Sequence, residues 1–201
     1  MRRLVPHLPG RTKRWQSAPR RPRYVVDIEL DDGAQLVERL RQQGLAPDEV
    51  IFKYFWPRYA PPSESGIQSL LKSENLAWQF ERLVAMHRIV PSAIPLPVGL
   101  VRNASGELIG YVLERIEGVA LQELVEVGAF VEVRRRLAAV ERTVAKLHAR
   151  SISHGDLNAY NVIASDDGRT ILIDPVASPG PGTMLQDELS LRELRELIPG
   201  S

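Results

Sequence analysis

The chain has 201 residues, 44% of them hydrophobic, which is enough for one sizeable core or two small lobes. Its 26 basic and 25 acidic residues give a net charge of +1, which does not favour DNA binding. The absence of cysteine excludes disulfides, thiolate catalysis and cysteine-based zinc sites. No apolar run approaches the ~20 residues that span a bilayer, and no signal-peptide core is visible. We therefore expect a cytoplasmic protein, with peripheral contact to the inner face of the membrane as an open alternative.

The positive charge gathers at the start of the chain. Eight basic residues and no acidic one precede Tyr24, and prolines interrupt this stretch. We expect residues 1–23 to form a disordered leader. Alternatively, this leader binds an anionic partner such as a membrane surface, a phosphorylated glycolipid or RNA. An organellar transit peptide is a third reading, which the prolines disfavour.

The first half of the chain is rich in predicted strands. β-Branched and aromatic runs bounded by turn residues predict strands over 24–30, 50–55, 98–102 and 108–115. A helix is predicted over 68–89, followed by an extended connector over 91–97. The segment 34–44 has the composition of a helix but the place of a strand, so both assignments stay open.

The second half of the chain changes its hydrophobic period. Apolar residues recur at spacings of three and four, which predicts a long helix with one buried stripe that ends near Ala149. The stripe consists of Phe130, Val133, Leu137, Val140, Val144 and Leu147. A hairpin over 162–163 and 171–173 and an amphipathic helix over 188–197 follow. This order indicates an α+β domain with two lobes.

One polar constellation carries chemistry. Asp156 and Asn161 lie five residues apart on the loop after the long helix, and Asp174 follows an apolar strand. Phosphoryl transfer needs a carboxylate that accepts the proton of the attacking hydroxyl, and oxygen ligands that hold Mg²⁺ on the phosphates. The spacing of these three residues supplies the lower half of such a site, with His154 bracing the loop.

The segment H-G-D-L-N-A-Y-N resembles the protein-kinase catalytic loop H-R-D-L-x-x-x-x-N, and I-L-I-D-P-V resembles the strand that ends in the D-F-G turn. The resemblance implies a two-lobed protein-kinase-like fold with a small β-rich N-lobe and a truncated, mostly helical C-lobe. It also implies ATP and Mg²⁺ as cofactors. By this resemblance Asp156 is the catalytic base, and Asn161 and Asp174 are the Mg²⁺ ligands. The boundaries it suggests are 24–116 for the N-lobe and 117–201 for the C-lobe.

The upstream half of the motif set is looser. Lys53 in I-F-K-Y-F resembles the strand lysine of V-A-I-K, which contacts the α- and β-phosphates. That lysine needs a carboxylate partner from the following helix. We predict Glu81 as this partner, with Glu74 in reserve. By the same resemblance, Glu114 and Ile116 lie where a kinase hinge offers backbone groups to adenine.

Two departures from the kinase pattern stand out. The glycine-rich loop G-x-G-x-x-G is missing, and only Gly33 lies where it belongs, so a pseudokinase remains an alternative. Gly155 replaces the arginine that reads activation-loop phosphate, which indicates that such a switch is absent. Pro175 and Val176 in place of F-G argue against the usual flip of that turn.

Two groups of short kinases look similar. Bacterial lipopolysaccharide core kinases share D-L-N-A-x-N and the tail after Pro181, and RIO kinases share H-G-D-L-x-x-Y-N. The first resemblance implies a sugar or glycolipid acceptor and the second a serine or threonine of a protein. We favour the sugar acceptor on the D-L-N-A match. Oligomeric state is left open by the sequence.

Overall fold

The computed structural model describes residues 28–30, 42, 46, 49–54, 65–103, 106, 108–176 and 182–199. The predicted leader 1–23 and Gly33 lie outside these residues, as does the segment 34–44 apart from Gln42, which is helical. The chain divides into two compact units, each described by itself below. Unit 1 comprises Met1–Ala77 and Leu96–Arg115, and unit 2 comprises Trp78–Pro95 and Ile116–Ser201.

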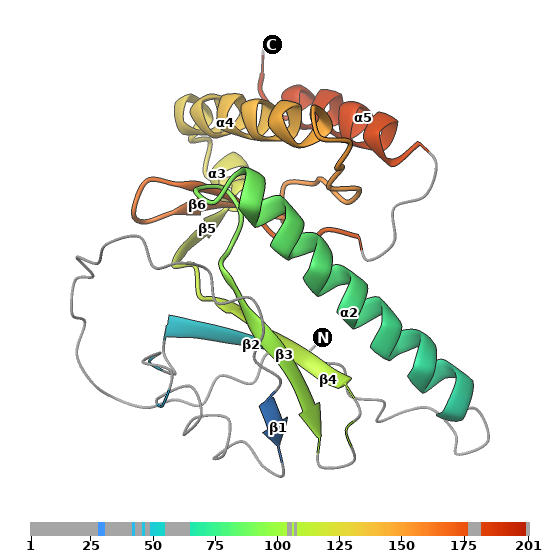
Figure 1. The fold of residues 1–201 in the computed structure, drawn as a ribbon. Coiled ribbons are helices and arrows are strands. Elements are labelled where there is room, and N and C mark those ends of the chain that lie inside the picture. The colour runs from blue at the N-terminus through green and yellow to red at the C-terminus, as the bar shows by residue number, and fades with distance from the viewer. Residues whose placement is uncertain are drawn as a thin grey trace. The chain divides into compact units, whose positions relative to one another are not determined.

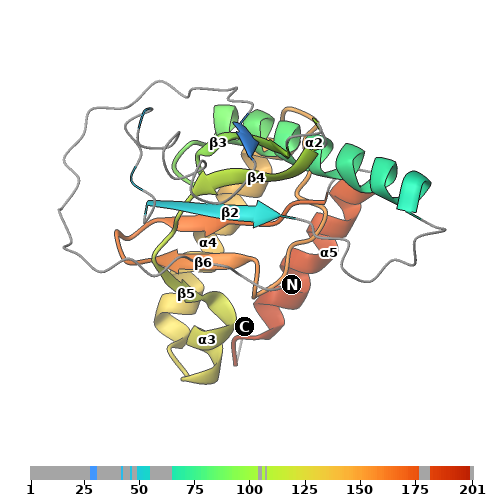
Figure 2. The same ribbon diagram turned by 90° about the horizontal axis from the view of Figure 1, so that it is seen from below.

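Unit 1 contains a four-stranded sheet. Its strands are β1 (Ile28–Leu30), β2 (Val50–Tyr54), β3 (Pro97–Asn103) and β4 (Leu108–Glu114), in the order β1-β3-β4-β2. β1 runs parallel to β3, and β4 pairs antiparallel with β3 and β2 (Figures 1 and 2). All four predicted strands are confirmed within the described residues. Their β-branched and aromatic residues suit a pleated surface with one buried face.

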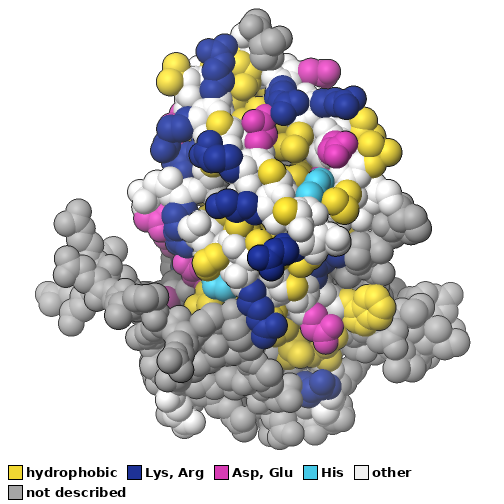
Figure 3. Space-filling view, turned by 45° about the horizontal axis from the view of Figure 1, so that its top comes forward, with side chains coloured by type: hydrophobic (Ala, Val, Ile, Leu, Met, Phe, Trp, Pro, Cys, Tyr) yellow, Lys and Arg dark blue, Asp and Glu magenta, His cyan; other side chains and the backbone are white. Residues whose placement is uncertain are grey.

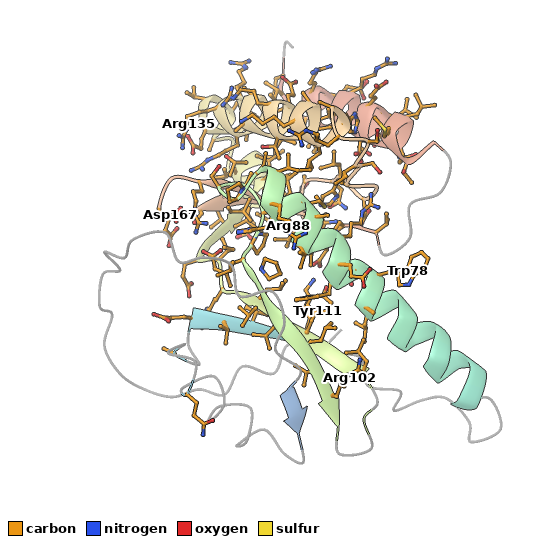
Figure 4. All side chains as sticks on the ribbon, in the orientation of Figure 1. Trp78, Arg88, Arg102, Tyr111, Arg135 and Asp167 are labelled. Carbon is orange, nitrogen blue, oxygen red and sulfur yellow. The ribbon has the colours of Figure 1, made fainter. Side chains whose placement is uncertain are left out.

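Lys53 lies in the middle of β2, opposite Tyr111 of β4. Tyr111, labelled in Figure 4, is buried, and this burial raises the pKa of its hydroxyl. Lys53 itself is half-buried. The predicted strand position of the lysine is therefore confirmed.

The helix α2 (Ser65–Ile89) confirms the helix predicted over 68–89. Its residues up to Ala77 belong to unit 1 and those from Trp78 to unit 2. Pro91 follows the helix by two residues, which fits because a proline disfavours helical backbone in the residue before it. The connector was predicted to be extended throughout, but it begins with a turn in which the Ala93 amide donates to the Val90 carbonyl at 2.9 Å.

Unit 2 is built on two helices that lie side by side, α4 (Phe130–His148) and α5 (Thr183–Glu196) (Figure 1). The predicted stripe of α4 is buried except for Phe130, which is half-buried. An ion pair of 2.7 Å between Arg195 Nε and Glu141 Oε1 joins the two helices at their surface. α5 begins at Thr183, five residues before the predicted start.

Unit 2 also contains a small sheet. It consists of β5 (Gly118–Ala120), β6 (Val162–Ser165) and β7 (Thr170–Leu172), paired antiparallel in that order. β6 and β7 form the predicted hairpin, whereas β5 and the short helix α3 (Leu121–Glu126) were not predicted. Gly118 has φ +152°, and a Cβ there would lie 2.2 Å from the Ala164 carbonyl oxygen. Only glycine therefore allows β5 to approach β6.

The turn of this hairpin is held by Arg136, a buried residue of α4. Its guanidinium donates to the Gly168 carbonyl at 2.8 Å and to the Arg169 carbonyl, and it pairs with Glu132. Figure 4 labels the neighbouring Arg135 on α4 and Asp167 at the turn. Hydrogen bonds from Arg135 and Arg136 lower the pKa of Glu132 to about 2. These contacts fix the hairpin to the helix that precedes the candidate site.

The surface shown in Figure 3 mixes charges of both signs with apolar residues. Lysine and arginine side chains recur across the coloured part of this face, with acidic and hydrophobic side chains between them. This pattern matches the near-neutral net charge of the whole chain. No described helix is both long and apolar enough to cross a membrane.

Candidate active site

The loop between α4 and β6 brings two of the predicted site residues together. Asn161 Nδ2 donates to the Asp156 carboxylate at 2.9 Å and to the Asp156 backbone carbonyl at 2.8 Å. The side chains of Leu157 and Ala159 are buried, so the loop is anchored on both sides of Asn158. Asp156 is exposed to solvent, and Asn161 is half-buried. The carboxylate is thus held in place while it remains accessible to a substrate.

The hydrogen bonds of Asn161 also determine which of its atoms is available to a cation. Both partners of Nδ2 on Asp156 are acceptors, so the nitrogen must point toward Asp156 and the amide oxygen away from it. Asn158 adds a weaker contact of 3.3 Å to the other Asp156 oxygen and accepts the Tyr160 and Asn161 amides. Oxygen ligands of this kind fit Mg²⁺.

The residue before Asp174 is hydrogen-bonded to the backbone of this loop. The Ile173 amide donates to the Asn161 carbonyl at 2.9 Å, which ties the residue before Asp174 to the residue that pairs with Asp156. Asp174 has φ +60°, a left-handed conformation that is strained for a residue other than glycine. Such strain is common at ligand-binding positions. Asp156, Asn161 and Asp174 all lie in unit 2, whereas Lys53, the other predicted catalytic residue, lies in unit 1.

The turn after Asp174 is fixed at both of its next residues. The Val176 amide donates to the His154 carbonyl at 3.0 Å, and Gln79 Nε2 donates to the Pro175 carbonyl at 2.8 Å. Proline also restricts its own φ. The turn after Asp174 is therefore hydrogen-bonded to the loop that carries Asp156 and to helix α2; that it does not flip stays a prediction.

Asp187 of α5 is a site residue that the sequence analysis missed. Its carboxylate is fully buried and accepts the backbone amides of His154 at 2.7 Å and Gly155 at 2.6 Å. It also pairs with His148 Nε2 at 2.9 Å, at the end of α4. The carboxylate thus holds the backbone of the loop just ahead of Asp156. A charged residue at a core position of α5 was the signal that could have revealed it.

His154 is buried as a neutral imidazole. Burial lowers its pKa to about 4, although the nearby charges of Asp187 and Asp156 favour the protonated form. Its ring nitrogens make no hydrogen bond of normal geometry with the described residues, while the Ile173 carbonyl lies near enough to favour a proton. That His154 braces the loop stays a prediction.

Gly155 is required by the geometry of the loop. Its φ is +82°, and a Cβ would lie 2.4 Å from Cγ2 of Val176. A side chain at this position therefore meets both backbone strain and a stiff β-branched neighbour. The missing arginine of the kinase pattern is explained by packing between the catalytic loop and the turn after Asp174.

The predicted nucleotide-binding residues fall in both units. Lys53 and Glu114 lie in unit 1, and Ile116 and Glu81 lie in unit 2. Glu81 is exposed on α2, so its pairing with Lys53, a residue of the other unit, stays a prediction. Glu114 Oε2 accepts the Leu96 amide at 3.0 Å.

The backbone of the predicted hinge is partly occupied. The Glu114 amide donates to the Leu96 carbonyl at 2.8 Å, and the Arg115 amide donates to the Glu49 carbonyl at 2.8 Å. Adenine would therefore have to use other groups of this segment, such as its carbonyl oxygens or the Ile116 amide. The roles of Glu114, Ile116 and Gly33 stay predictions.

The helix–loop–hairpin order, with its paired aspartate and asparagine, defines a protein-kinase-like fold. A solved structure supports this class: the bifunctional kinase-methyltransferase WbdD matches with a TM-score of 0.51 over 73% of this chain and 33% of its own, at 21% identity. Residues 70–178 match the model of the RIO domain. The chain belongs to the RIO domain family.

Two curated relatives give a second comparison. The 3-deoxy-D-manno-octulosonic acid kinases of Xylella fastidiosa strains M23 and Temecula1 are each 27% identical to the chain over 119 residues. The alignments cover 56% of this chain and 47% of each relative. The chain thus spans about half the length of the curated relatives it matches.

Proposed function

We propose that this protein is an ATP- and Mg²⁺-dependent phosphotransferase that phosphorylates a hydroxyl group of a lipopolysaccharide-core-type sugar. The observation that carries the proposal is the hydrogen-bonded pair of Asp156 and Asn161, tied through the Asn161 carbonyl to the residue before Asp174. The names of the curated relatives support a sugar acceptor. We further propose a cytoplasmic location, in which the basic leader 1–23 contacts an anionic surface.

The chain's own residues have distinct tasks in this mechanism. Asp156, exposed and oriented by two amide side chains, accepts the proton of the acceptor hydroxyl as that oxygen attacks the γ-phosphate, whose bond to the bridging oxygen of ADP breaks so that ADP leaves. The Asn161 amide oxygen and the Asp174 carboxylate hold Mg²⁺. When bound, Mg²⁺ neutralises charge on the phosphates. Lys53, paired with Glu81, positions the α- and β-phosphates, and the segment with Glu114 and Ile116 contacts adenine.

A phosphotransfer assay with labelled ATP tests the proposal. The acceptors are lipopolysaccharide cores, free core sugars and generic protein substrates. We expect transfer to the sugar acceptors, loss of transfer in Asp156→Ala with nucleotide binding retained, and weaker Mg²⁺-dependent binding in Asp174→Ala. Full activity of Asp156→Ala would rule out its role as the base.

A protein acceptor is the second candidate, and the match to the RIO domain favours it. In that case the same assay gives phosphoserine on protein substrates or on the enzyme itself, and no transfer to sugars. The boundary between N-lobe and C-lobe near residue 116 also stays a proposal, which limited proteolysis would test.

A pseudokinase is the alternative from another class, because the sequence lacks the glycine-rich loop. Thermal-shift measurements with ATP and Mg²⁺, read together with turnover, distinguish a pseudokinase from an active kinase. Saturation at 100 times the dissociation constant stabilises a protein by about 2.7 kcal/mol. A clear shift without turnover would indicate a nucleotide-binding module, and no shift with no turnover would indicate a scaffold.

A further inference from the structure

We infer that Arg82 and Gln79 of α2 are positioning residues that hold the catalytic loop and the metal-binding turn in register. The inference rests on the proposed function for its kinetic part. Both side chains belong to unit 2, as do the two segments that they contact. Neither residue belongs to a motif that the sequence analysis identified.

Arg82 holds the start of the catalytic loop. Its Nη2 donates to the backbone carbonyl of Ser153 and, at 2.8 Å, to the Ser153 hydroxyl. The Ser153 hydroxyl in turn donates to the Thr183 hydroxyl at 2.8 Å, at the first residue of α5. One guanidinium therefore joins α2, the residue before His154, and the beginning of the helix that carries Asp187. Hydrogen bonds from a charged donor are the stronger kind.

Gln79 holds the turn after Asp174. It lies three residues before Arg82, about one helical turn away, and donates to the Pro175 carbonyl at 2.8 Å. Neighbouring side chains of one helix thus reach two segments that lie far apart in the sequence, at residues 153 and 175. Both segments also bond to each other through the Val176 amide and the His154 carbonyl.

Two opposing effects act on the charge of Arg82. Its guanidinium is half-buried, and this burial lowers the pKa of Arg82, while the nearby Asp187 carboxylate raises it. The Asp187 carboxylate accepts the amides of His154 and Gly155, and Arg82 donates to the carbonyl of Ser153. The anionic Asp187 therefore binds amides of the loop, and the cationic Arg82 binds one of its carbonyl oxygens. This arrangement fixes the position of Asp156 without an arginine at position 155.

The consequence for the reaction is specific. A base misplaced by about 1 Å can cost roughly 100-fold in rate, whereas binding of ATP does not depend on the base. Loss of Arg82 should therefore lower kcat and leave the KM for ATP unchanged. Loss of Gln79 should instead raise the Mg²⁺ concentration needed for activity, because the outer contacts of a metal ligand tune affinity by roughly tenfold or more.

The kinetic test uses Arg82→Met, which keeps the length of the side chain and removes its donors. We expect kcat per folded protein to fall roughly 10- to 100-fold, with partial recovery in Arg82→Lys, which keeps one charged donor group. Gln79→Met should raise the half-maximal Mg²⁺ concentration roughly tenfold. Arg142→Met, at an exposed arginine of α4, is the matched control and should behave as wild type.

Hydrogen exchange provides a readout that does not need catalysis. Arg82→Met should speed exchange of the amides of His154, Gly155 and Val176 at a temperature where α4 stays protected, and Arg142→Met should not. Unchanged exchange of these amides would overturn the inference, and so would an unchanged kcat in an active enzyme. If the wild type transfers phosphate to no acceptor, the proposed function fails, while the exchange result still decides the inference.

Discussion

Replacing Asp187 by asparagine tests whether a buried carboxylate holds the catalytic loop. Asparagine has nearly the same shape but only one acceptor oxygen, so it cannot receive the amides of both His154 and Gly155 as the two carboxylate oxygens do. One of these amides would then face the Nδ2 donor of the new side chain. The substitution therefore removes an acceptor without creating a cavity.

The magnitude follows from these contacts. A hydrogen bond to a charged acceptor contributes about 1.5–3 kcal/mol, and a buried donor left without a partner costs about 1–3 kcal/mol. We therefore expect Asp187→Asn to lower the free energy of unfolding by about 3–5 kcal/mol. Domains of this size are stable by only about 5–15 kcal/mol, so the loss is a large fraction of the total.

Urea unfolding of the full chain measures this change. The control is Glu188→Gln, the same chemical change at the neighbouring exposed residue of α5, for which we expect less than about 0.5 kcal/mol. Phosphotransfer by the folded fraction of Asp187→Asn should also decrease, because the backbone ahead of Asp156 is released. A loss of stability below about 1 kcal/mol would refute the reasoning, since it would mean that neither amide depends on the carboxylate.

The remaining predictions concern three other residues. Because the pKa of His154 falls to about 4 in the folded state, the unfolded state binds the proton first. The free energy of unfolding should drop by about 3 kcal/mol as the pH falls from about 6.5 to 4. Urea unfolding at several pH values measures this change. The free energy of unfolding should depend less on pH in His154→Leu. Gly155→Ala should lower the free energy of unfolding by more than about 1 kcal/mol, measured by thermal unfolding. Adding Val176→Ala to this variant should restore only part of the lost stability, because φ of residue 155 stays positive. Arg136→Met should release the β6–β7 turn, seen as faster exchange of the Gly168 amide, while Arg135→Met at the exposed neighbour should leave it protected.

Regular elements with long apolar patterns could be predicted from the sequence. The stripe of α4 was found because its buried positions repeat at helical spacing over about four turns. β5 and α3 were missed because three and six residues are too few to show a period. The turn at the start of the connector was missed because its prolines indicate extended backbone, and the bond from Ala93 to Val90 leaves no pattern in the sequence.

The candidate site divides in the same way. Asp156 and Asn161 are close in the chain, so a short loop suffices to bring their side chains into contact, while their roles stay predictions. Asp187 comes from a distant helix, and only its charged side chain at a core position of α5 distinguished it. Arg82 and Gln79 lie within an ordinary helical pattern, and apart from the Ser153 hydroxyl their partners are backbone carbonyls that any residue would offer. Contacts of this kind cannot be predicted from residue types.

The position of Asp187 also matters for how the domain is divided. The segment that matches the RIO domain ends at residue 178, so it includes Asp156, Asn161 and Asp174 but excludes α5. A recombinant fragment trimmed to that segment would keep the acidic and amide groups of the candidate site and lose the carboxylate beneath them. Two amides and one imidazole would then exchange their buried acceptor for water. The segment that matches the RIO domain is therefore shorter than the part of the chain that folds together. That folding unit extends at least to α5.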